Sequence, residues 1–140
     1  MDDIKTILVP VDGSEGSNKA VDFAITLAQA YKAKLEFLYI ANINQMAINA
    51  CLSDAILDAV TKAGDAILDK ALAEVPHDVP AEAFSETGSP SVTILEFAEE
   101  NKNNMIVMGS RGLGVVKGVL LGSVSQYVVE NAKCPVVIIK

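Results

Sequence analysis

Short runs of apolar, often β-branched residues recur along the chain, separated by polar or glycine-containing turns. Runs that are apolar at nearly every position are typical of strands buried on both faces of a sheet. The first run contains Pro10 near its end and leads into the turn Asp12-Gly13-Ser14. The pattern predicts five strands, at residues 4–11, 35–41, 81–86, 105–108 and 135–139.

Between these runs, apolar residues recur every three or four positions, which is the period of a helix with one buried face. Ser14 or Ser17 is placed to cap the first helix, and Ser89 followed by Pro90 is typical of a capped helix start. Gly64 weakens the second helix only slightly. The four predicted helices cover residues 16–32, 52–72, 90–101 and 123–132, and residues 42–51 are left undefined.

Strands that alternate with helices predict an α/β fold. We expect a single domain over residues 1–140, with a doubly wound, five-stranded, mainly parallel sheet and helices on both faces. If the strand order is 3-2-1-4-5, the first and fourth strands are neighbours, and Asp12 faces Gly109 across the crevice at their carboxyl ends. Open α/β sheets bind ligands in such a crevice.

Composition limits the classes of partner. The formal net charge is −7 and no Lys/Arg cluster stands out, which disfavours nucleic acid and anionic membranes. No apolar stretch approaches the about 20 residues that span a bilayer, and the amino terminus lacks a signal-peptide layout, so we expect a cytoplasmic protein. Cys51 and Cys134 form no CxxC pair, which argues against a disulfide framework or a zinc site. His77 lies in a connection and is expected at the surface.

Five of the nine glycines, at positions 109, 112, 114, 118 and 122, fall in one loop between the fourth strand and the last helix. A loop so rich in glycine lets backbone N–H groups approach a bulky anion, for which phosphate is the natural candidate. It is not a Walker A motif, because no Gly-Lys precedes a Ser or Thr. The dinucleotide pattern GxGxxG also fails, because Lys117 stands at its sixth position.

What remains is Gly109, two residues, Gly112, nine residues, and Gly122-Ser123. This spacing resembles the nucleotide loop of the ATP-binding members of the universal stress protein family. Residues 7–14 resemble the opening of that family and residues 134–139 its closing strand, so the resemblance covers nearly the whole chain. It implies a Rossmann-like, adenine nucleotide alpha hydrolase-like fold, a homodimer, and bound ATP, or else ADP or AMP, with Mg²⁺ carried by the phosphates.

The resemblance also implies three groups of ligand contacts. The adenine side would meet Pro10, Val11, Asp12 and Ile40, the ribose and first phosphates would meet Met108, Gly109, Arg111 and Gly112, and the distal phosphates would meet Gly122, Ser123, Val124 and Ser125. The residues support the last group independently, because the first N–H groups of a helix are unpaired and lie at the positive end of its dipole. The hydroxyls of Ser123 and Ser125 are expected to add donors.

Each of these residues also has a simpler explanation. Asp12 can form an Asx-turn without touching a ligand. Arg111 and Lys117 fit solvated loop charges, and the two serines fit an ordinary helix start. Four aspartates on the second helix fit a solvated face better than a metal site.

Hydrolysis would need a positioned base or water-orienting residue and a cation near the terminal phosphate, and the sequence presents no clear set. We therefore expect a regulatory stress-response protein that binds ATP and hydrolyses it slowly or not at all. The alternative is an ATPase or a phosphoryl- or adenylyl-transfer enzyme that uses Arg111 or Lys117. A nucleotide-free interaction module is a third possibility, against which the intact glycine loop argues.

The last strand bears on oligomerisation. Residues Val136 to Ile139 are all apolar and are expected to form the edge of an open sheet. A bare apolar edge is an aggregation hazard that proteins usually cover or pair. Pairing with a second copy across a two-fold axis predicts a homodimer, and the alternative is an edge covered by the chain's own helices.

Overall fold

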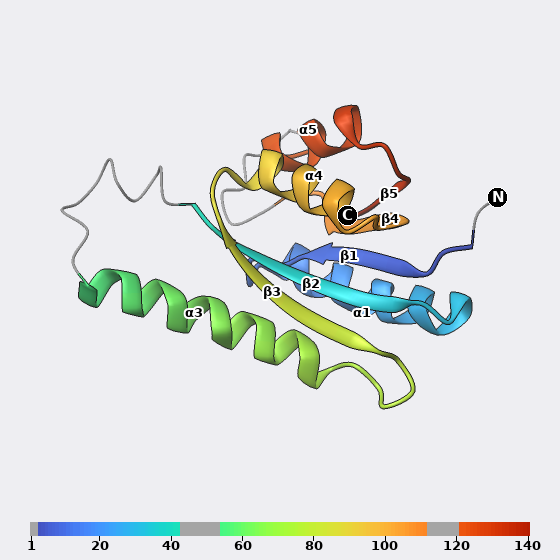
Figure 1. Ribbon diagram of the computed structural model, residues 1–140, viewed down its shortest axis with the longest axis horizontal. Helices are drawn as coiled ribbons and strands as arrows, with labels where there is room; N and C mark the ends of the chain where they lie inside the picture. Colours follow the sequence, from blue (N-terminus) through green and yellow to red (C-terminus); the bar gives the residue numbers. More distant parts are fainter. Residues whose placement is uncertain (1–2, 43–53, 112–120) are drawn as a thin grey trace.

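The computed structural model describes residues 3–42, 54–111 and 121–140. Within these ranges strands and helices alternate along the chain, and a twisted sheet lies between two helical layers (Figure 1). The elements are β1 (Thr6–Pro10), α1 (Glu15–Tyr31), β2 (Lys34–Ala41), α3 (Asp54–Ala73), β3 (Ala81–Thr87), α4 (Pro90–Glu100), β4 (Met105–Gly109), α5 (Ser123–Asn131) and β5 (Val136–Ile139).

The strands form one parallel sheet in the order β3-β2-β1-β4-β5. This order confirms the predicted doubly wound α/β fold. The register places Ile7 of β1 beside Leu35 of β2 and beside Met105 of β4. Ile7, Leu8 and Val9 are fully buried, as expected for a central strand covered on both faces.

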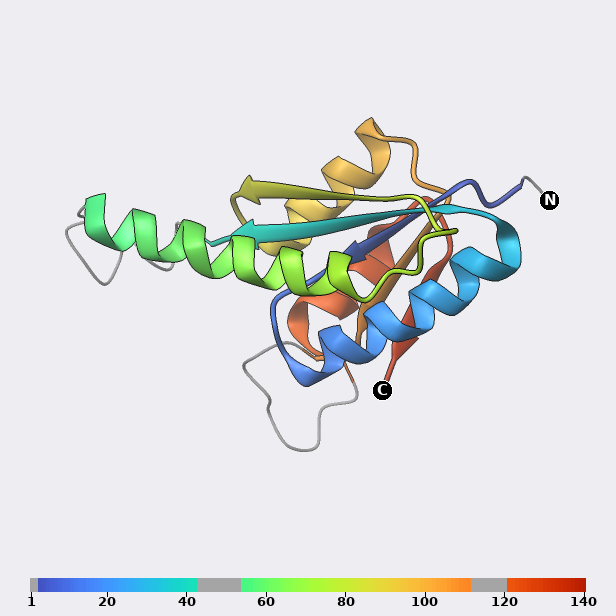
Figure 2. The same cartoon turned by 90° about the horizontal axis from the view of Figure 1, so that it is seen from below.

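Helices α1 and α3 cover one face of the sheet, and α4 and α5 cover the other (Figures 1 and 2). Because side chains alternate along a strand, β2 directs Phe37 to the α1 and α3 side and Leu38 to the α4 and α5 side. Burying a side chain as large as Phe37 stabilises the fold by roughly 1.5–3 kcal/mol. No helix within the described ranges combines the length and apolar character needed to cross a membrane.

The helix starts agree with the sequence in part. Ser14 is the N-cap of α1, and its hydroxyl oxygen accepts a hydrogen bond from the Ser17 N–H at 3.2 Å, so Ser14 rather than Ser17 caps the helix. Ser89 occupies the N-cap position of α4 and Pro90 follows it, but the Ser89 hydroxyl forms no capping hydrogen bond. The helix predicted from residue 52 is described from Asp54 onward.

The order of the strands places a crevice between β1 and β4. Helix α1, which follows β1 in the chain, covers one face of the sheet, and α5, which follows β4, covers the opposite face. Connections that depart to opposite faces leave the carboxyl ends of two neighbouring strands uncovered, which is where open α/β sheets hold their ligands.

Candidate functional site

A cavity of about 740 Å³ opens at the carboxyl ends of β1, β2 and β4. Every site residue predicted from the sequence lines it, apart from Gly112, which lies outside the described residues. The predicted residues in its wall are Pro10, Val11, Asp12, Ile40, Met108, Gly109, Arg111, Gly122, Ser123, Val124 and Ser125. This volume is within the range of small-molecule sites, about 300–1,000 Å³.

Asp12 lies in the turn that joins β1 to α1. Its Oδ1 accepts a hydrogen bond from the Ser14 N–H at 2.9 Å, which is the Asx-turn expected as the simpler explanation. The Asp12 N–H donates to the Ser17 hydroxyl oxygen at 3.2 Å, and Gly13 has a φ of 84°, which suits glycine. Asp12 also lines the cavity, so the turn holds the carboxylate in place there.

The start of α5 forms another part of the cavity wall. The Gly122 N–H donates to the Ser110 carbonyl oxygen at 2.7 Å, so this amide is already paired. Ser123 and Val124 are the first two residues of the helix, whose N–H groups have no intrahelical acceptor. The N–H donors that α5 can offer to a ligand therefore come from its first three residues, Ser123, Val124 and Ser125.

Ser125 is almost fully buried, at 2% exposure, although it lines the cavity. Its hydroxyl donates to the Ser110 carbonyl oxygen at 2.7 Å and lies 3.1 Å from the Gly122 carbonyl oxygen. The hydroxyl proton is thus directed at the protein rather than at a ligand. Through this hydroxyl, Ser125 ties the start of α5 to the end of β4, and its contact with a phosphate stays a prediction.

A side chain at position 109 would collide with the backbone of a neighbouring helix. A Cβ at this position would lie 2.8 Å from the carbonyl carbon of Gly16 and 2.9 Å from its oxygen. The first turn of α1 therefore packs directly on the end of β4. Glycine is needed at position 109 for this contact between backbones, whether or not a ligand is bound.

Comparison with known proteins agrees with the fold. The model of the universal stress protein family matches residues 3–140. The universal stress protein YxiE of Bacillus subtilis is 34% identical over 144 residues, which cover 96% of this chain and 97% of the relative. The chain belongs to the universal stress protein family.

Solved structures of similar proteins share this fold. The hypothetical protein MJ0577 superposes with a TM-score of 0.89 at 22% identity, over 99% of this chain and 97% of that one, which shows a shared fold. A universal stress protein in complex with cAMP is 30% identical, with a TM-score of 0.65, over 99% of this chain and 98% of that one.

Several further residues of this universal stress protein line the cavity and were not among the predicted site residues. They come mainly from the start of α1, the end of β2, the start of α4, and α5, and they are Ser14, Ser17, Leu38, Asn42, Ser89, Pro90, Ser91, Ile94 and Tyr127. The Ser-Pro helix start after β3 was a usable signal, because a helix that follows a parallel strand begins at the carboxyl edge of the sheet. No sequence pattern marked Tyr127.

The rest of the glycine loop of this family member, residues 112–120, lies outside the described residues, and so do Gly112 and Lys117. Arg111 lines the cavity at the last described position of the loop. His77 is exposed, as predicted, and so are Asp54, Asp58 and the other two aspartates of α3. Among the residues that the structure describes, no three His, Cys, Asp or Glu side chains gather as metal ligands.

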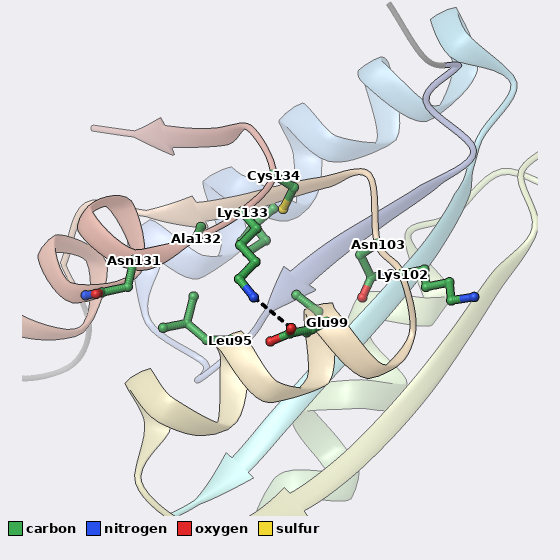
Figure 3. A pocket seen from close by; sticks show the side chains of 10 residues that line it. Leu95, Glu99, Lys102, Asn103, Asn131, Ala132, Lys133 and Cys134 are labelled. Carbon is green, nitrogen blue, oxygen red and sulfur yellow. Dashed lines mark hydrogen bonds and ion pairs between the residues drawn. The ribbon is translucent and has the colours of Figure 1, made fainter.

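A smaller cavity, of about 210 Å³, lies between the ends of α4 and α5 (Figure 3). Lys133 Nζ reaches Glu99 Oε1 at 2.9 Å beside it, and this hydrogen bond raises the pKa of Lys133. Burial raises the pKa of the Cys134 thiol, which keeps the thiol protonated and weakly nucleophilic. The residues before β4 and β5 form this cavity, so it lies at the amino ends of the strands and contains none of the predicted site residues.

Proposed function

We propose that this protein binds an adenine nucleotide, ATP in the first place, in the cavity at the carboxyl ends of β1 and β4. The observation that carries the proposal is the combination within one cavity of apolar side chains and the unpaired N–H groups that begin α5. A nucleotide has the matching parts, an apolar base and an anionic tail. The relative that is 30% identical and was solved with cAMP supports the same class of ligand.

The proposed orientation places the phosphates at α5. The N–H groups of Ser123 and Val124 face the anionic tail, and the positive end of the helix dipole stabilises an anion there by about 0.3–1 kcal/mol. In the orientation implied by the family resemblance, Pro10, Val11, Asp12 and Ile40 contact the base side, while Met108, Gly109, Arg111 and Gly112 follow the ribose and first phosphates. Mg²⁺ would arrive with the phosphates.

The same geometry favours slow hydrolysis or none. Among the described residues that line the cavity, Asp12 is the one carboxylate, and Ser14 holds it in a turn. A base for water attack would have to stand close to the terminal phosphate. We therefore propose a regulatory role in the stress response, in which the bound nucleotide sets the conformation that partners recognise.

Calorimetry on protein freed of carried-over ligand tests this proposal. We expect ATP to bind, with ADP and AMP weaker because they leave amides at α5 unused, and we expect guanosine to be a poor competitor. Absence of heat with all three adenine nucleotides at millimolar concentration would rule the proposal out. Arg111 also lines the cavity, so a single-turnover assay comparing the wild type with Arg111→Ala separates a binding protein from a phosphoryl-transfer enzyme.

We also propose a homodimer that forms through β5. This strand lies at one edge of the sheet, and its four residues, Val136–Ile139, are all apolar and all partly exposed. The opposite edge strand, β3, instead exposes Glu82, Ser85 and Glu86. Pairing β5 with a second copy would cover the apolar edge.

A further inference from the structure

Tyr127 is an aromatic residue in the cavity wall. It stands on α5, one turn after the helix start, and 43% of its surface is exposed. Single exposed apolar side chains are common, so exposure alone carries no meaning. The position of Tyr127 is informative, because it is the one aromatic side chain among the described residues that line the cavity.

The apolar part of the cavity lining indicates which part of a ligand it suits. The apolar side chains of Leu38, Ile94 and Met108 line the same cavity and belong to the core cluster between the sheet and the layer of α4 and α5. Phosphate oxygens lose their hydration against such a wall without gaining hydrogen bonds, which is unfavourable. The uncharged nucleoside end of the ligand therefore occupies this part of the cavity.

A second helix narrows the cavity on the same side. Pro90 and Ser91 at the start of α4 also line it, and α4 packs beside α5 over the same face of the sheet (Figure 1). Tyr127 and the start of α4 therefore line the same cavity as Val11 and Ile40, which come from the ends of β1 and β2.

We propose that Tyr127 is a specificity-determining residue of the nucleotide site, whose ring packs against the base of the bound nucleotide. This inference rests on the proposed function and deepens it. An aromatic ring attracts a base through its π face, and this attraction does not depend on the phosphates. Tyr127 would therefore favour ligands with a base over ligands that are only an anionic tail.

Substitution of Tyr127 distinguishes the contribution of the base to the binding affinity from that of the phosphates. We expect Tyr127→Ala to weaken ATP binding about tenfold, the effect of losing one base-aromatic stack. Tyr127→Phe keeps the ring and should bind ATP like the wild type. Inorganic triphosphate, which has no base, should bind the wild type and Tyr127→Ala equally. Calorimetry measures all of these affinities.

Fluorescence tests independently whether the nucleotide contacts residue 127. The chain contains no tryptophan, so Tyr127→Trp introduces a single one into the cavity wall. We expect ATP to quench its emission with the affinity found by calorimetry. The matched control is Tyr31→Trp, because Tyr31 is 48% exposed on α1 and is not among the residues of the cavity wall. ATP should leave the emission of this control unchanged.

The outcomes distinguish failure of the role assigned to Tyr127 from failure of the proposed nucleotide binding. If ATP binds the wild type and Tyr127→Ala equally, or if Tyr127→Ala weakens ATP and triphosphate by the same factor, the role assigned to Tyr127 is wrong while the nucleotide site stands. Quenching of the Tyr31→Trp control equal to that of Tyr127→Trp would also overturn it. If ATP does not bind the wild type, the proposed function and this inference fail together.

Discussion

Two glycines of the loop serve different purposes, although the sequence pattern presents them as equivalent. Gly109 is fixed by its contact with the backbone of Gly16. At Gly122, a Cβ would lie 3.4 Å from the Ser110 carbonyl oxygen and 3.5 Å from the Cα of Arg111, which are ordinary contacts. The φ and ψ of Gly122, −68° and 164°, are open to any residue. The fold thus needs glycine at position 109 and tolerates alanine at position 122.

The corresponding variants should separate stability from binding. We expect Gly109→Ala to lower the free energy of unfolding by about 1–3 kcal/mol, because the backbones of β4 and α1 must move apart. Gly122→Ala should change it by less than about 0.5 kcal/mol. It should nevertheless weaken ATP about tenfold, because a methyl group beside the Ser123 and Val124 amides disturbs a charge-assisted hydrogen bond. Urea unfolding and calorimetry measure the two effects, and unchanged ATP affinity in folded Gly122→Ala would contradict the proposed phosphate site.

At the scale of elements, the packing of α3 on the sheet depends on Gly64. This residue is buried in α3, and a Cβ there would overlap the ring of Tyr39 on β2. Alanine in place of glycine within a helix normally stabilises by about 1 kcal/mol. Here the overlap outweighs the gain, because α3 or the ring must shift in a packed region. We expect Gly64→Ala to lower the free energy of unfolding by about 1–2 kcal/mol.

The neighbouring Asp65 supplies the control for this prediction. It is exposed on the same helix, so Asp65→Ala changes helix propensity without meeting Tyr39. Urea unfolding should show Asp65→Ala equal to or more stable than the wild type. An increase in stability for Gly64→Ala would mean that α3 does not pack on Tyr39 as described.

The elements themselves could largely be predicted from the sequence, because their apolar periods are local. The order 3-2-1-4-5 was expected and the structure confirms it, but strand spacing alone does not dictate it, because alternating strands and helices fit other doubly wound orders as well. The sequence could not explain why particular positions need glycine. Gly64 is required by its contact with Tyr39 and Gly109 by its contact with Gly16, and both contacts join residues that are distant in the chain. Tyr127 was missed because no local pattern marks it as a residue of the cavity wall.

At the scale of the whole molecule, the proposed dimer depends on the backbone of β5. The Ile106 N–H donates to the Pro135 carbonyl oxygen and the Ser110 N–H donates to the Ile139 carbonyl oxygen. Because the hydrogen-bonding direction alternates along a strand, these bonds imply that the N–H and C=O of Ile138 point away from β4. They are therefore available to a second copy. Phe23 on α1 and Val129 on α5 are exposed by 41% and 45%, and these two helices pack against β5 on its two faces.

Removing one outward donor tests this pairing. Ile138→Pro deletes the Ile138 N–H without removing a bond to β4, and proline is tolerated in an edge strand. Ile138→Ala removes a similar part of the side chain and keeps the N–H. Light scattering at micromolar concentration should find a dimer for the wild type and for Ile138→Ala, and a monomer for Ile138→Pro. If the wild type is itself a monomer, the apolar edge is not paired in this way, and if both variants dissociate equally, side-chain packing rather than strand pairing holds the two copies together.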